Sequence, residues 1–232
     1  MKIKLIIALS CFISALNAGT FSAKALKALN KPYELIFGSQ DASESYQRAA
    51  RIALADYGVT NPELVAIKQI NPKASTLIDK DLLSFTLFGI WLNEQALNEI
   101  DPAIKEWAIY HEVAHHVLNH HAKALALTSL LGLLIAQQFC YTPFDNKAIN
   151  ALCTGLVGYF SYETLKSYVR VQELQADIEA TRILCLIGKK ETVESYLKLL
   201  KEEMVAGSPS DEWHYSFADQ YSTINYYYQL YK

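Results

Sequence analysis

The chain has 232 residues, of which 51% are hydrophobic and 19% are charged, and its formal net charge is −3. This length and composition are typical of a compact globular domain that is large enough to enclose a catalytic cleft. The weakly acidic charge has none of the basic clusters of nucleic-acid-binding proteins and argues against that class.

The first residues have the layout of a secretory signal peptide. Two lysines precede an apolar run from Leu5 to Leu16, and the small residues Ala18 and Gly19 follow. The run is too short to serve comfortably as a membrane anchor. We expect cleavage of residues 1–18, which removes two lysines and no acid and so changes the charge from −3 to −5. Residues 19–232 would then form a single exported domain, located in the periplasm or outside the cell.

Three segments before residue 93 have the patterns of regular structure. Asp41–Tyr57 carries apolar residues at helical spacing and is followed by Gly58, a residue typical of helix ends. Glu63–Ile70 and Leu82–Leu92 are rich in β-branched and aromatic residues. Both are therefore predicted to be strands.

The next segment contains a motif of metal chemistry. Asp101-Pro102 predicts a helix start, because the aspartate can cap the first amides and the proline needs no N–H there. The helix should continue through His111-Glu112-Val113-Ala114-His115. Residues four apart share a helix face, so His111 and His115 can bind one zinc ion. Glu112 lies about 100° round the helix, where it can act as general base.

Three further histidines follow the motif: His116, His120 and His121. By helical phase they lie away from the face that His111 and His115 share. We therefore expect them at the surface or in packing contacts, and not on the metal.

Two apolar stretches come next. Ala124–Phe144 contains no charged residue, and the shorter Ala148–Tyr162 contains Gly155 and Gly158. Beyond them, Glu173–Leu186 and Glu191–Met204 are predicted helices. A turn at residues 207–209 precedes a tail that is dense in aromatic residues. The predicted fold class is α+β and mostly helical, with a small sheet before the metal-binding helix.

A catalytic zinc site needs three protein ligands and one open position. Glu173-Leu174-Gln175-Ala176-Asp177 places two carboxylates four residues apart on one helix face. Glu173 can supply the third ligand, and Asp177 can accept the ring N–H of a ligating histidine. His115 and Glu173 must lie on the same side of any membrane to share a metal. Both apolar stretches therefore cross a bilayer or neither does, and their lengths favour a helical hairpin over 124–162 that is buried or dips into a membrane.

These motifs resemble those of a known family. HExxH, its extension by His120 to HExxHxxxxH, and the later Glu-x-x-Ala-Asp are similar to the gluzincin zinc metallopeptidases that include HtpX, BepA and the type I CAAX prenyl protease. The resemblance covers roughly residues 40–186 and implies a zincin-like domain in which Phe85–Leu92 is an edge strand that holds extended substrate. It implies one Zn²⁺ ion per chain, with the following residues in the site: His111, His115 and Glu173 as ligands, Glu112 as catalytic base and Asp177 as orienting acid.

The family also has a C-terminal histidine that helps to stabilise the tetrahedral intermediate and is usually followed by a proline and later by an arginine. His214 is the candidate for this catalytic role. However, Tyr215 follows it, and no arginine occurs after Arg182. Tyr215 and Tyr221 are the alternative donors.

The sequence thus predicts a zinc-dependent metalloendopeptidase of the cell envelope. Its expected partners are extended or misfolded protein segments, with membrane association through residues 124–162 and no nucleic acid. One alternative is a chaperone-like or scaffold protein that keeps the metal fold without cutting. Another is a membrane-associated helical protein without a metal.

Overall fold

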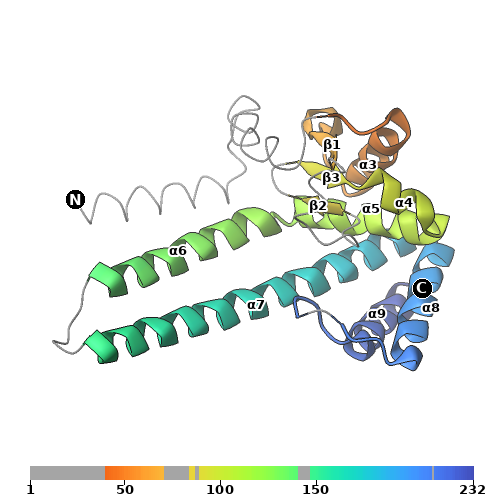
Figure 1. Cartoon of the computed structure of the whole chain (residues 1–232). Coiled ribbons are helices and arrows are strands. Elements are labelled where there is room, and N and C mark those ends of the chain that lie inside the picture. The colour runs from red at the N-terminus through yellow and green to blue at the C-terminus, as the bar shows by residue number, and fades with distance from the viewer. Residues whose placement is uncertain (1–39, 71–83, 87–88, 141–146, 211) are drawn as a thin grey trace.

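The computed structural model describes residues 40–70, 84–86, 89–140, 147–210 and 212–232. The expected signal peptide lies outside this part. Figure 1 shows two parts: a body that contains the strands and most helices, and a long pair of helices, α6 and α7, that projects from it. The described helices are α3 (Glu44–Asp56), η1 (Pro62–Leu64), α4 (Glu94–Glu99), α5 (Pro102–Val117), α6 (His120–Cys140), α7 (Lys147–Leu186), α8 (Lys190–Ala206) and α9 (Phe217–Tyr231).

The sheet has three described strands in the order β1-β3-β2: β1 (Ile67–Gln69), β2 (Ser84–Thr86) and β3 (Ile90–Leu92). β1 pairs with β3 in parallel, and β2 pairs with β3 antiparallel. The mostly helical α+β class is confirmed.

Both predicted strands are corrected by this sheet. Leu82–Leu92 contains two short antiparallel strands, because Ser84 pairs with Leu92 and Thr86 with Ile90. β3 is the central strand, so the expectation that all of Phe85–Leu92 forms an edge strand is wrong, and within the described sheet that edge belongs to β2. The predicted strand Glu63–Ile70 is shorter than expected. Pro62 starts the 3₁₀ helix η1, which includes Glu63 and Leu64, and the strand β1 has only three residues.

Gly89 is required by the close approach of β3 to the residue before β1. The Ile90 N–H donates to the carbonyl oxygen of Ala66 at 2.8 Å. A Cβ atom on Gly89 would lie 2.6 Å from that oxygen. Only glycine fits this contact without a shift of the backbone.

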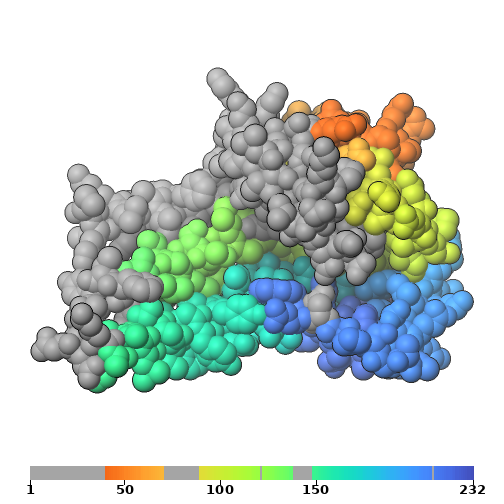
Figure 2. Space-filling view, in the orientation of Figure 1, coloured from red at the N-terminus to blue at the C-terminus, as the bar shows by residue number. Residues whose placement is uncertain are grey.

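The helical hairpin predicted for 124–162 is confirmed, since α6 and α7 run side by side in opposite directions (Figure 1). The predicted start of a separate helix at Glu173 is wrong, because α7 is continuous over 40 residues and about 60 Å long. No helix within the described residues is long and apolar enough to cross a membrane. Figure 2 shows α7 exposed along the hairpin as it leaves the body.

The core of the body surrounds α5, which packs against α3, α7 and α8. Its fully buried side chains include Leu54, Leu97, Val113, Leu184 and Ile224. The last of these belongs to α9, a helix that hydrophobic spacing in the aromatic tail did not reveal. A local signal was present, because the Ser216 side chain caps α9 by accepting the N–H of Asp219 at 3.1 Å.

Candidate metal centre

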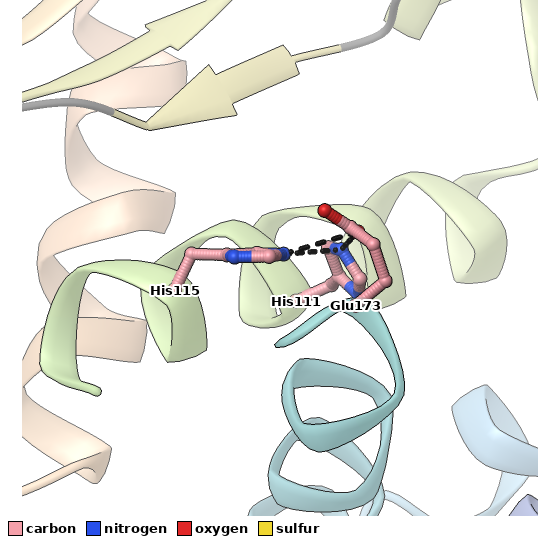
Figure 3. Close-up of side chains that lie close together, drawn as sticks. All are labelled: His111, His115 and Glu173. Carbon is pink, nitrogen blue, oxygen red and sulfur yellow. Dashed lines mark hydrogen bonds and ion pairs between the residues drawn. The ribbon is translucent and has the colours of Figure 1, made fainter. Parts of the chain in front are cut away.

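The metal motifs meet where α5 crosses α7. His111 and His115 lie one turn apart on α5, as predicted, and Glu173 approaches them from α7 (Figure 3). The possible ligand atoms of these three residues all lie within 4.8 Å of one another. His115 Nε2 is 3.0 Å from His111 Nε2, and Glu173 Oε2 is 3.2 Å from each of these nitrogens.

Asp177 lies one turn beyond Glu173 on α7 and orients His111. The Nδ1–H of His111 donates to Asp177 Oδ1 at 2.8 Å, because an ionised carboxylate can only accept. In neutral His111 this bond leaves Nε2 with a lone pair that faces Glu173. The arrangement matches the sequence expectation for Asp177.

His120 orients His115 in the same way that Asp177 orients His111. Its Nδ1 lies 3.0 Å from His115 Nδ1, and the His120 side chain is buried. Burial, followed by the charges of His115 and Lys123, lowers the pKa of His120 to about 3. Neutral His120 can therefore accept the Nδ1–H of His115, which directs the Nε2 lone pair of His115 toward Glu173.

From the sequence we expected His120 to lie at the surface or in a packing contact. Packing is correct, but the contact with His115 was missed, because one continuous helix was assumed. α5 ends at Val117, Asn119 has a left-handed φ of 54°, and α6 begins at His120. The break changes the helical phase. The signal that could have found the contact was the motif HExxHxxxxH itself.

The donor set fits a metal cation. Two imidazole lone pairs and one carboxylate oxygen converge, and such atoms repel one another unless positive charge lies between them. Imidazole and carboxylate are ligands that suit Zn²⁺. The electrostatic surroundings of His111 also favour positive charge at this site. Burial alone lowers the pKa of His111, but Asp177 and Glu173 outweigh it and hold this pKa well above its usual value.

Glu173 is affected in the opposite sense. Burial raises its pKa, but contacts with His115, His111 and His214 outweigh burial and hold it well below its ordinary value. Glu173 is therefore an anion at neutral pH, as a metal ligand must be.

Glu112 and two aromatic residues lie beside the centre. Glu112 is buried on α5 beside His111. The Trp107 ring packs against the His111 ring with centroids 5.2 Å apart. The Trp107 ring also stacks on the Tyr196 ring. Trp107 and Tyr196 were not identified from the sequence, because α8 supplies Tyr196 only through tertiary packing.

His214 reaches the same centre from the connection between α8 and α9. Its Nε2 lies 3.5 Å from Glu173 Oε2, and its side chain is 41% exposed. The centre therefore brings together His111, His115, Glu173, Asp177 and His214.

These features define a class of protein: a mostly helical α+β protein with a histidine and carboxylate metal centre at the crossing of two helices. The model of peptidase family M48 matches residues 88–218, which is more than half of the chain. The matched range includes every residue of the metal centre described above. Searches of curated proteins and of solved structures gave no match. The chain belongs to peptidase family M48, a family of zinc-dependent metallopeptidases, and the suspected gluzincin resemblance is confirmed.

Proposed function

We propose that this peptidase is a zinc-dependent metalloendopeptidase that cuts extended or misfolded segments of cell-envelope proteins. The observation that carries the proposal is the convergence of His111 Nε2, His115 Nε2 and Glu173 Oε2 within 4.8 Å. In this proposal the three residues hold Zn²⁺, and Asp177 keeps His111 in the tautomer that presents Nε2.

When bound, zinc supplies a Lewis acid that polarises the scissile carbonyl and acidifies a water molecule. Glu112 then accepts the proton of the attacking water and later delivers it to the leaving amine. His214 donates a hydrogen bond to the oxygen that gains negative charge, a role supported by its place beside Glu173. The Trp107 ring, which stacks on Tyr196 of α8, packs against the His111 ring.

The substrate proposal rests on β2. This strand is at an edge of the described sheet and packs against α5, the helix that carries both histidines. An extended peptide can add to such an edge through main-chain hydrogen bonds, which tolerate many side chains.

The test compares the wild-type protein with Glu112→Gln and Glu173→Ala. We expect wild-type protein to bind one zinc ion and to cleave unfolded casein in a chelator-sensitive way. Glu112→Gln should retain zinc and lose turnover by at least about 100-fold, whereas Glu173→Ala should lose zinc as well. Loss of zinc from Glu112→Gln would refute its assignment as the base.

A non-cutting chaperone-like or scaffold protein is the second candidate. It is favoured by Tyr215 after His214 and by the absence of arginine after Arg182. Stoichiometric zinc binding, together with binding of unfolded casein without cleavage, would support it over the peptidase.

We also propose that residues 1–18 direct export and that the hairpin of α6 and α7 associates with a membrane surface. The pattern of lysines, apolar run and small residues supports export. A mature protein whose measured mass corresponds to a chain that starts at Gly19 would agree with this proposal. Cytoplasmic protein that keeps residues 1–18 would contradict it.

A further inference from the structure

The segment 212–214 is attached to one face of α7 by contacts of several kinds. The Arg170 Nε–H donates to the main-chain carbonyl of Glu212 at 2.9 Å. Lys166 Nζ lies 3.5 Å from Glu212 Oε2. The Trp213 ring stands edge-on to the Tyr162 ring, with centroids 5.9 Å apart.

The three contacting residues of α7 are four residues apart, so Tyr162, Lys166 and Arg170 follow one another along one helix face. The next turn presents Glu173, whose Oε2 lies 3.5 Å from His214 Nε2. The contacts thus run along α7 in the direction of the metal centre, and His214 lies at their end.

Charge supports the attachment. The hydrogen bond from Tyr162, followed by the charges of Lys166 and Arg170, lowers the pKa of Glu212. The ion pair between Lys166 and Glu212 contributes little alone, because the Glu212 side chain is exposed. The bond from Arg170 to a main-chain oxygen restrains the backbone itself, two residues before His214.

We propose that Arg170, assisted by Lys166 and Tyr162, is a positioning residue that holds the segment 212–214 so that His214 faces the metal centre. This inference rests on the proposed function of His214. The cation that holds the segment, Arg170, lies on α7, the helix that also carries Glu173.

The experiment uses the full chain with zinc and compares Arg170→Gln, His214→Ala and the double variant. Arg182→Gln is the matched control, since Arg182 also lies on α7 but bonds Glu179 of the same helix at 2.8 Å. The readouts are amide hydrogen exchange over residues 212–216 and the kcat and KM of peptide hydrolysis.

We expect Arg170→Gln to speed exchange in this segment roughly 3- to 10-fold, as the loss of one hydrogen bond predicts. It should lower kcat with little change in KM, and it should cause no further loss in the His214→Ala background. Glu212→Gln keeps the main-chain carbonyl that accepts from Arg170 and removes the negative charge that Lys166 pairs with, so its effect should be smaller. The control should match the wild type.

Unchanged exchange in Arg170→Gln, or an equal further loss of kcat in the His214→Ala background, would overturn the proposal. If the wild-type protein does not hydrolyse peptides, the proposed peptidase function fails, while the exchange comparison still decides whether Arg170 holds the segment.

Discussion

His111 and His115 are oriented by groups of different chemistry. His111 donates to the carboxylate of Asp177, and His115 contacts the neutral ring of His120. A carboxylate increases the basicity of the imidazole that it accepts from, whereas a neutral imidazole mainly fixes the ring and its tautomer. The two proposed ligands therefore differ in donor strength although they come from one helix.

Removal of the His120 ring should weaken metal binding. We expect His120→Ala to lower zinc affinity roughly 10- to 100-fold, the range seen when a partner of a ligating histidine is lost. The measurement is competition with a chromogenic chelator. His116→Ala is the control, because His116 lies next to His115 but is absent from the ligand contacts described above. Equal affinities for the two variants would contradict the role of His120.

At this scale the sequence predicted the site well. His111, Glu112 and His115 depend only on helical spacing, and Glu173 with Asp177 repeats that spacing in a second helix. His120 escaped because its position depends on the left-handed backbone of Asn119, which no spacing rule contains.

Among the elements, two glycines with opposite surroundings test the packing of the sheet and the hairpin. Gly89→Ala should lower the free energy of unfolding by about 1–3 kcal/mol, since the new Cβ meets the Ala66 carbonyl. Gly155→Ala lies within α7 with no atom near its Cβ, so it should raise stability by up to about 1 kcal/mol. Chemical denaturation measures both, and a stabilising Gly89→Ala would refute the close approach.

The junction of α5 and α8 should weaken in acid. Glu106 accepts hydrogen bonds from Lys189 and Thr192, both at 2.7 Å. Burial raises its pKa, but these partners outweigh burial and lower it below the ordinary value. The Glu106 contribution is therefore present above the unfolded pKa and is lost as pH falls through the lower folded pKa.

Glu106→Gln should accordingly cost about 0.5 kcal/mol at pH 7, a small value because the pair is one-third exposed and screened by solvent. The difference from wild type should shrink as pH falls through the lowered folded pKa of Glu106. Denaturation in excess chelator measures this without interference from metal loss. The exposed Glu202→Gln serves as control, and a difference that persists in acid would exclude the ionic contribution.

Several elements were beyond the reach of the sequence for physical reasons. The alternation of side chains in a run of β-branched and aromatic residues is the same whether the run forms one strand or two. Only the observed register shows that β2 and β3 are separate strands that pair with each other. The start of α7 was misplaced because its apolar and charged parts have different compositions, although no residue between them interrupts a helix.

The whole molecule presents an unusual apolar surface on the hairpin. Within the described part of 124–162, eight large hydrophobic side chains are exposed: Leu130, Leu134, Ile149, Leu152, Leu156, Tyr159, Phe160 and Tyr162. Burial in a lipid surface would remove this area from water, and the stretch 124–144 carries no charge that would oppose it.

We expect the protein to co-sediment with vesicles of phosphatidylethanolamine and phosphatidylglycerol. Leu152→Glu and Phe160→Glu should each weaken this binding roughly tenfold, the effect of losing one buried apolar side chain. Val205→Glu, at an exposed position on α8 outside the hairpin, should bind vesicles as the wild type does. Equal losses in all three variants, or no binding by the wild type, would reject the membrane proposal.

The sequence by itself determined the proposed metal ligands and predicted that they lie in helices, because helical spacing is a local property and each motif is complete within five residues. It did not determine where α7 begins. The tertiary structure alone decided how the three strands pair, that His120 contacts His115, and that α7 holds the segment bearing His214. Each of these features depends on a break in a helix or on contacts between distant parts of the chain. Neither can be predicted from the spacing of residues along the sequence.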